Sequence, residues 1–341
     1  MAKLQEIAIE TLIDRYEVLL LDAYGVLVHS SGALAGAAEL IAKLNRAAKP
    51  YYILTNDASR LPTTAAARFH SMGLAIGADR IITSGALLKG YFAKNRLRGA
   101  RCVVLGPEDS ARYVQLAGGE VVPPKENFEV LVIGDESGFP FLDTVDSVLS
   151  GLIRKLDHGE KFHLVLPNPD LIYPKSDREF GITGGGIALI LEAALHQRYP
   201  GQTNLHFDRL GKPHDTIFKE ALRRSGTRNM VMIGDQLATD IRGARAFGLD
   251  SVLIASGIAN MHAIILSLSR WSLEAPILAA PRHAATPAMK RRWVNRLAVP
   301  HSRPVPVRAM CSAAWTVISS RRAHVSLNES PSGEMSRSWK Q

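Results

Sequence analysis

The sequence predicts an α/β protein: a doubly wound parallel sheet as its core, interrupted by an inserted α/β domain. Short runs rich in leucine and β-branched residues alternate with longer amphipathic segments, which is the pattern of parallel strands joined by helices. Several of the short runs end at a polar residue. With 341 residues, the chain is also long for a single hydrophobic core. Together these observations predict two domains of sheet covered by helices.

The core is predicted from four apolar runs, expected to be strands at 18–21, 51–54, 230–233 and 251–255. Amphipathic helices are expected at 36–47 and 216–224, because each segment places its apolar residues on one face. After the last strand, Gly257, Asn260 and His262 interrupt a weakly charged stretch that is too short for a membrane span. A loop and a helix are expected there.

A second group of strand-like runs predicts the inserted domain, with strands at 102–105, 130–133 and 162–166. Helices are expected beside these strands at 109–116 and 142–155. The expected division of the chain is a core of residues 1–79 and 196–270 with an inserted cap of residues 80–195. Hinges are expected near 79–84 and 197–204.

The net charge of +9 belongs to the C-terminal part of the sequence. Residues 261–341 carry 12 lysines and arginines against 3 acidic residues, whereas residues 1–260 carry 29 of each kind. Residues 271–341 lack periodicity and are predicted to be a disordered tail with a short helix at 290–297. Nucleic-acid binding by this basic tail is the less favoured hypothesis, because basic runs are often merely solvated.

Composition points to a protein of a reducing compartment. The chain has two cysteines, Cys102 and Cys311, which are too few for a disulfide framework or a thiolate zinc site. The first 17 residues contain four acidic residues and no apolar run, which is unlike a signal peptide. We therefore expect a cytoplasmic location and no insertion into a membrane.

Polar residues end three of the predicted core strands. Asp22 follows the strand at 18–21, Thr55 follows the next strand, and Asp235 lies just after the strand at 230–233. Ligands of open α/β sheets bind outside the carboxyl ends of the strands, so these three side chains are expected to converge. The alternative for an isolated aspartate such as Asp22 is a turn or a helix cap.

Residues near these strand ends suit a phosphate group and a metal ion. Thr55 and Asn56 offer a hydroxyl and an amide, both donors for phosphate oxygens. Lys212 lies between a glycine and a proline, although a loop lysine is often only solvated. Asp235 and Asp240 lie five positions apart and, with the acid of the first strand, would form an oxygen-rich site for Mg²⁺. Both acids could instead cap the following helix.

In this order, the segments around Asp22, Thr55, Lys212 and Asp235 resemble the four motifs of the haloacid dehalogenase superfamily. Each motif is weak alone, but their joint order is specific. The resemblance covers about residues 10–260 and does not reach the tail. It implies a hydrolase fold with an active site at the carboxyl ends of the core strands.

The resemblance implies a role for each matched residue. Asp22 would attack phosphorus as the nucleophile, Thr55 and Asn56 would hold the phosphoryl oxygens, and Lys212 would neutralise charge. The implied Mg²⁺ ligands are Asp22, the backbone carbonyl of Tyr24 and Asp235, with Asp240 supporting the metal waters and Lys212. Phosphoryl transfer mostly needs positioning and charge neutralisation around an in-line nucleophile, which agrees with these residue types.

The place of the insertion narrows the resemblance to subclass IIA. Asp22 and Thr55 are 33 positions apart, too close for a lid domain, whereas Thr55 and Lys212 are 157 apart. A cap in the second interval looks like subclass IIA, which includes phosphatases of sugar phosphates, pyridoxal phosphate, nitrophenyl phosphate and phosphoglycolate. This resemblance implies a small phosphorylated metabolite as substrate, and a homodimer is one expected assembly.

Two segments of the cap are also similar to that subclass. Asn168 and Asp170, on either side of Pro169, are implied to contact the substrate. The glycines at 184–186 follow them. Turn chemistry alone would also explain both segments.

Tyr24 departs from the superfamily pattern, because most of its phosphatases have aspartate at this position as the general acid. General acid–base catalysis contributes about 10²–10⁴-fold, so two alternatives stay open. The site could bind a phosphorylated ligand with little turnover, or perform dehalogenase-type hydrolysis, which needs neither acid nor metal. His29 is a candidate substitute proton donor, since histidine titrates near neutrality, although a loop histidine is more often solvated.

Overall fold

The structure is a computed structural model, and it describes residues 5–175, 179–254 and 264–266. The expected basic tail and its short helix lie outside the described residues. Within the described part of the chain, no helix combines the length and the apolar character needed to cross a membrane.

In the described residues, the core is built on a seven-stranded sheet that contains the four core strands that the sequence predicts. Its strands in spatial order are β1 (Gln5–Ile7), β16 (Ile264–Leu266), β15 (Asp250–Leu253), β14 (Met230–Gly234), β2 (Val18–Leu21), β5 (Tyr51–Thr55) and β6 (Ile81–Thr83). The five strands from β15 to β6 are parallel, whereas β16 runs antiparallel to both β1 and β15. Of the stretch after the strand at 251–255, where a loop and a helix are expected, the described residues 264–266 form the antiparallel strand β16, and the rest lies outside the described residues.

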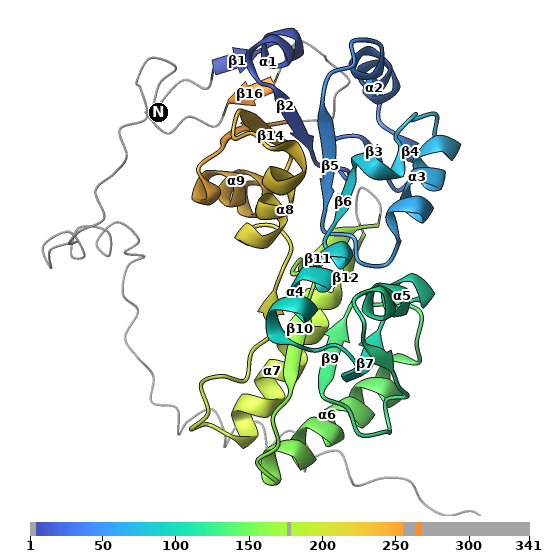
Figure 1. The fold of residues 1–341 in the computed structure, drawn as a ribbon, viewed down its shortest axis with the longest axis vertical. Helices are drawn as coiled ribbons and strands as arrows, with labels where there is room; N and C mark the ends of the chain where they lie inside the picture. The colour runs from blue at the N-terminus through green and yellow to red at the C-terminus, as the bar shows by residue number, and fades with distance from the viewer. Residues whose placement is uncertain (1–4, 176–178, 255–263, 267–341) are drawn as a thin grey trace, which may run out of the picture. The chain divides into compact units, whose positions relative to one another are not determined.

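Helices cover both faces of the core sheet (Figure 1). One face packs against α1 (Ile9–Arg15), α2 (Ala37–Arg46) and α3 (Pro62–Ser71), and the other against α8 (Asp215–Ser225) and α9 (Arg242–Phe247). Successive side chains of a strand point to opposite faces of the sheet, so both faces of β2 carry leucines. Leu19 and Leu21 pack with the first group of helices, and Leu20 packs with the second. The doubly wound α/β core is thus confirmed.

The inserted domain has its own parallel sheet. Its strands in spatial order are β13 (Asp208–Arg209), β10 (His163–Leu166), β9 (Val130–Ile133), β7 (Arg101–Leu105) and β8 (Glu120–Val121). The helices of this domain are α4 (Leu88–Asn95), α5 (Glu108–Leu116), α6 (Phe141–Asp157) and α7 (Gly184–Arg198). Leu131 and Leu164 pack with α6 and α7, while Val130 and Val165 belong to the cluster of α4 and α5.

Short elements complete the described fold. They are the hairpins β3 (Val28–His29) with β4 (Gly32–Ala33) and β11 (Ile172–Pro174) with β12 (Phe180–Ile182), the 3₁₀ turns Ala78–Arg80 and Gly85–Leu87, and a π-helical turn at Leu237–Ile241. The first hairpin follows the strand that ends at Asp22, and the π-helical turn follows β14.

The observed strand pairing places both domain boundaries at other positions than the sequence predicts. β6 was expected to lie in the cap (80–195), but it pairs with β5 in the core sheet. β13 was expected to lie in the core (196–270), but it pairs with β10 in the cap sheet. The reason is that a strand's sheet depends on its hydrogen-bond partner, which local composition does not specify. We propose boundaries near residues 84 and 210 instead.

Candidate active site

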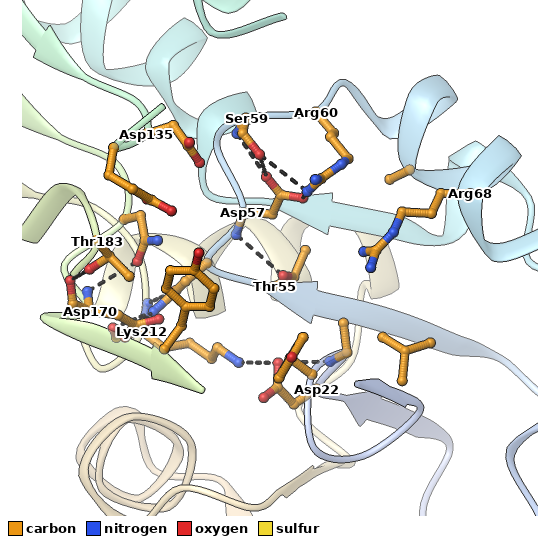
Figure 2. Close-up of a pocket in the computed structure, with 18 of the residues that line it drawn as sticks. Asp22, Thr55, Asp57, Ser59, Arg60, Arg68, Asp135, Asp170, Thr183 and Lys212 are labelled. Carbon is orange, nitrogen blue, oxygen red and sulfur yellow. Dashed lines mark hydrogen bonds and ion pairs between the residues drawn. The ribbon is translucent and has the colours of Figure 1, made fainter. Parts of the chain in front are cut away.

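Asp22 lies at the carboxyl end of the central strand β2 and is 5% exposed. Its Oδ1 accepts hydrogen bonds from the backbone N–H of Ala23 at 2.7 Å and from Lys212 Nζ at 2.6 Å. Burial and the nearby carboxylate of Asp240 raise the pKa of Asp22 well above its usual value, and Lys212 opposes this shift. Figure 2 shows the Lys212 side chain directed at this carboxylate, with a dashed line for their contact.

Lys212 is the charge centre of the site and is only 2% exposed. Its Nζ lies 2.6 Å from Asp22 Oδ1 and 2.7 Å from Asp240 Oδ1, so one ammonium bridges two buried carboxylates. Burial by itself lowers the pKa of Lys212, but the two carboxylates outweigh it and hold the pKa above its usual value. The lysine is therefore a fixed positive charge rather than a solvated loop residue.

Asn56 holds the backbone of Lys212. The side-chain Oδ1 of Asn56 accepts the N–H of Lys212 at 2.7 Å, and its Nδ2 donates to the carbonyl of Lys212 at 3.0 Å and to Asp170 Oδ1 at 3.0 Å. Gly211 permits this close approach, since an added Cβ would lie 2.4 Å from Asn56 Oδ1. Both amide hydrogens are thus engaged, which does not fit the expected role of Asn56 in holding phosphoryl oxygens.

Three carboxylates gather beside Lys212. One oxygen from each of Asp22, Asp235 and Asp240 lies within 4.8 Å of the others. Asp240 is fully buried, and its Oδ2 accepts the backbone N–H of Gln236 at 3.1 Å. The described structure offers no hydrogen-bond partner to the buried Asp235 Oδ1.

The environment of Asp235 fits a cation ligand. Burial, followed by the charge of Asp240, raises the pKa of Asp235 to about 6. Gly25 has a positive φ of 87°, and a Cβ there would lie 2.1 Å from Asp235 Oδ2, so the loop after Asp22 needs glycine to pass this carboxylate. An orphaned buried oxygen within an all-carboxylate cluster is the donor set that suits Mg²⁺.

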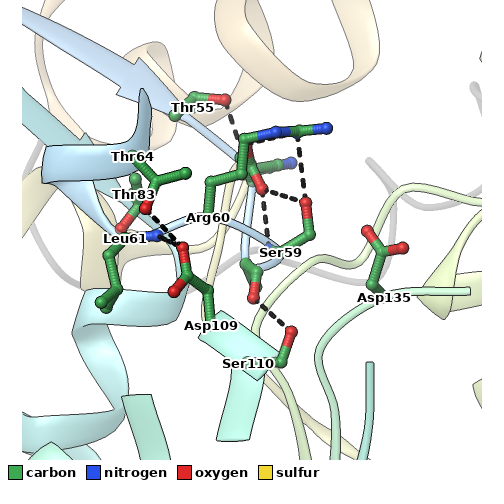
Figure 3. Close-up of polar contacts among 12 residues, drawn as sticks. Thr55, Ser59, Arg60, Leu61, Thr64, Thr83, Asp109, Ser110 and Asp135 are labelled. Atoms are coloured by element: carbon green, nitrogen blue, oxygen red, sulfur yellow. Dashed lines mark hydrogen bonds and ion pairs between the residues drawn. The ribbon is translucent and has the colours of Figure 1, made fainter. Parts of the chain in front are cut away.

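Thr55 begins a loop that both domains hold in place. Thr55 Oγ1 accepts the N–H of Asp57 at 3.2 Å, and Asp57 Oδ2 lies 3.1 Å from Arg60 in an ion pair. From helix α5 of the cap, Asp109 Oδ2 accepts the N–H of Leu61 at 2.9 Å (Figure 3). Sequence reasoning missed Asp57, Arg60 and Asp109, because nothing in their local pattern shows that two domains meet at this loop.

On the cap side, the segment at 168–170 forms a turn. Asn168 Oδ1 accepts the N–H of Asp170 at 3.0 Å, and the Asp170 carbonyl accepts from the N–H of Gly185 at 3.1 Å and from the Thr183 hydroxyl. Burial raises the pKa of Asp170, while Lys212 opposes the shift. The glycines at the start of α7 serve this packing, since a Cβ on Gly185 would lie 2.2 Å from the Asp170 carbonyl oxygen.

The contacts of Tyr24 and His29 are not those of a proton donor to the leaving group. The Tyr24 hydroxyl donates to the carbonyl of Pro174 in β11 at 3.0 Å. His29 Nδ1 accepts the N–H of Ser31 at 3.0 Å, and His29 is not among the residues that line the cavity over Asp22. The structure therefore does not bring His29 together with the other candidates.

A cavity of about 680 Å³ opens above Asp22. The predicted residues that line it are Asp22, Tyr24, Thr55, Asn56, Asn168, Asp170 and Lys212. It also contains charged residues that the sequence did not single out, namely Asp57, Arg60, Arg68, Asp135 and Glu136. Asp235 and Asp240 lie beneath this set, next to Asp22 and Lys212.

Two family profiles match this chain. The haloacid dehalogenase-like hydrolase profile matches residues 19–120, and a HAD-hydrolase-like profile matches residues 209–267. These two ranges contain the core residues described above, from Asp22 and Thr55 to Lys212 and Asp235.

Several known proteins are similar to this chain over most of its length. A dihydroxyacetone phosphatase of Corynebacterium glutamicum is 28% identical over 71% of this chain and 82% of its own length. An acid sugar phosphatase of Staphylococcus saprophyticus is 25% identical over 73% of this chain and 90% of its own length. A solved structure from Cytophaga hutchinsonii, described as a possible sugar phosphatase of the HAD superfamily, is 31% identical, with a TM-score of 0.65, and the match covers 75% of this chain and 90% of the other.

Proposed function

This chain belongs to the haloacid dehalogenase superfamily of hydrolases, and from that premise we propose that it is a phosphatase of small phosphate esters. The observation that carries the proposal is the buried group of Asp22, Lys212 and Asp240 at the base of the cavity. A carboxylate bonded to an ammonium beneath an open cavity is a suitable nucleophile for phosphorus. The dihydroxyacetone and acid sugar phosphatases among its relatives support sugar phosphates as the substrate class.

In the proposed reaction, Asp22 attacks phosphorus through its free Oδ2. Oδ1 is held by Ala23 and Lys212, which orients the carboxylate toward the cavity. A bond forms between the carboxylate oxygen and phosphorus, and the bond from phosphorus to the leaving oxygen breaks, with its electron pair going to that oxygen. Water then attacks the aspartyl phosphate, which releases phosphate and restores the carboxylate.

Lys212 and Thr55 would position the phosphoryl group during both steps. Lys212 places a fixed positive charge beside Asp22, where negative charge develops on the phosphoryl oxygens. The Thr55 hydroxyl lines the same cavity and accepts only a backbone N–H, so its own hydrogen is free to be donated. Asn56 would act through Lys212, by holding the lysine backbone in place.

We propose Mg²⁺ as the cofactor, held by Asp22, Asp235 and the Tyr24 backbone carbonyl, with Asp240 as the supporting acid. The orphaned Asp235 Oδ1 and the three converging carboxylates support this site. When bound, the ion would supply positive charge to the transferring phosphoryl group. Retention of these acids also disfavours dehalogenase-type chemistry, which does not require them.

Metal dependence tests this proposal directly. Hydrolysis of p-nitrophenyl phosphate is expected to require Mg²⁺ and to stop on addition of a chelator. The substitution Asp235→Asn is expected to weaken activation by Mg²⁺, and Asp157→Asn, at an exposed ion pair with Arg198 in the cap, serves as the matched control. Equal turnover with and without chelator would contradict the proposed cofactor.

A second candidate function is binding of a phosphorylated ligand with little turnover. It is favoured by Tyr24, whose hydroxyl donates to Pro174 instead of pointing to a leaving group. Measurements of thermal stabilisation and of turnover with the same panel of phosphate esters distinguish the two functions. Stabilisation without hydrolysis of any ester would support the binding function and contradict the phosphatase.

A further inference from the structure

We propose that Arg68 binds a second acidic group of the substrate, so that phosphate esters carrying an additional carboxylate or phosphate are preferred. The proposal rests on the phosphatase function above and adds the chemical class of the leaving group. Arg68 belongs to helix α3 of the core and lines the cavity that opens over Asp22. Figure 2 shows its side chain directed from α3 into the cavity, on the same side as Arg60.

Arg68 is a half-buried cation that no carboxylate of the described residues contacts directly, although the negative charge of Asp57 acts on it from beyond ion-pair distance. Its guanidinium takes part in none of the hydrogen bonds or ion pairs within the described residues. Burial, followed by the positive charge of Arg60, lowers the pKa of Arg68 from its usual value. A guanidinium with five donors in a fixed fork matches a carboxylate or a phosphate, so this position is suited to an anion.

The other cations of the cavity already have partners. Arg60 pairs with Asp57 at 3.1 Å, and Lys212 pairs with Asp22 and Asp240. Among the described cations that line the cavity, Arg68 is therefore the one whose charge is not balanced by a direct contact. An acidic group of a ligand would supply that contact.

The opposite side of the cavity would direct such a group toward α3. The cap loop after β9 contributes Asp135 and Glu136, and burial together with Asp135 raises the pKa of Glu136. These two acids would repel an anion at the cap loop. On the α3 side, Ala65 and Phe69 line the cavity beside Arg68 and are almost fully buried, so an ion pair there would be partly shielded from water.

The experiment compares matched esters that differ in their second group. 3-Phosphoglycerate is compared with glycerol 3-phosphate, and 1,3-propanediol bisphosphate with 1,3-propanediol monophosphate, which distinguishes a carboxylate from a phosphate. For each pair the ratio of kcat/KM values, acidic over neutral, is measured for the wild-type protein and for Arg68→Gln and Arg68→Lys. His70→Gln is the matched control, because His70 lies exposed on the same helix and does not line the cavity.

We expect a wild-type ratio above one for at least one pair, and a decrease of this ratio by about tenfold to hundredfold in Arg68→Gln, as for a lost charge-assisted hydrogen bond. Arg68→Lys should lower it less, and His70→Gln should leave it unchanged. Equal losses on acidic and neutral esters would overturn the proposal, since Arg68 would then bind the transferring phosphoryl group. A wild-type preference for the neutral esters would also overturn it.

Thermal stabilisation by the same four compounds separates this proposal from the phosphatase function. If no ester is hydrolysed, the phosphatase function fails. Greater stabilisation by an acidic ester than by its neutral partner, lost in Arg68→Gln, would still support the role of Arg68. Equal stabilisation by both members of each pair would overturn that role even in an active enzyme.

Discussion

The two sides of the cavity differ in how their charges are balanced. On the core side, Asp22, Lys212 and Asp240 are nearly inaccessible, and each charge contacts an opposite charge within 2.7 Å. On the cap side, Asp135 and Glu136 are adjacent like charges that are only half-buried. A buried, paired group tolerates little change, whereas a half-buried loop can be altered without disturbing the fold. The buried group around Asp22 is therefore suited to the reaction, whereas the half-buried residues of the cavity, namely the cap loop and Arg68 of α3, are suited to the choice of ligand.

The largest difference in activity is expected between two variants, each of which removes one carboxylate, one on the core side and one on the cap side of the cavity. Asp22→Asn should lower kcat on p-nitrophenyl phosphate by at least about 10⁴-fold, because an amide cannot replace the nucleophile. The matched change Asp135→Asn on the cap loop should alter kcat/KM by less than about tenfold, since it removes no bond to the reacting atoms. Steady-state kinetics with equal amounts of folded protein measures both. Comparable losses would show that the cap loop takes part in the chemistry.

Lys212→Met is expected to affect both activity and stability. It should lower kcat by about 10²–10³-fold, as for loss of a preorganised charge. It should also destabilise the fold by about 3–5 kcal/mol, because two buried carboxylates would lose their shared cation. Chemical denaturation measures the stability change.

Lys43→Met provides the surface control for this experiment. The ion pair of Lys43 with Glu10 is substantially exposed, so its loss should cost at most about 1 kcal/mol. A decrease for Lys212→Met as small as for this control would mean that the buried carboxylates become protonated at little cost.

Tyr24→Asp tests the general-acid position, which lies between the two sides. With Tyr24 hydrogen-bonded to Pro174, the rate should fall steeply as the leaving group becomes less acidic. The aspartate should raise the rate on glycerol 3-phosphate by up to about 10²-fold and flatten that dependence. Tyr24→Phe, which removes only the hydroxyl, should leave the dependence as steep as before. Fast wild-type hydrolysis of alkyl esters that Tyr24→Asp only slows would point to another proton donor.

The smallest expected effect concerns how the cap turn is held against α7. Gly185→Ala should destabilise the protein by about 1–3 kcal/mol, because its Cβ would meet the Asp170 carbonyl at 2.2 Å. Gly90→Ala in α4 has open space around it and should stabilise the protein by about 0.5–1 kcal/mol. Thermal unfolding of the two variants compares them. Equal shifts would mean that the turn at 168–170 moves aside at no cost.

Much of the core side was predictable because strand ends converge in a parallel sheet. β5, β2 and β14 are adjacent parallel strands, so Thr55 at the end of β5 and Asp22 and Asp235 just after β2 and β14 lie at the same edge of the sheet. The apolar runs that define these strands are visible in the sequence, and the position of each polar residue follows from them. The role of Asn56 was not predictable, since its partners Lys212 and Asp170 lie more than 110 positions away.

By itself, the sequence determined the α/β class and the central strands of the core, and it predicted an inserted domain and the ordered set Asp22, Thr55, Lys212 and Asp235. These depend on local periodicity and on the regular geometry of parallel sheets. Only the tertiary structure decided which sheet β6 and β13 join, what Asn56 holds and that Arg68 faces the cavity. The physical reason is that pairing partners, charge balance and the direction of a side chain arise between segments that are distant in the chain, and no local pattern carries that information.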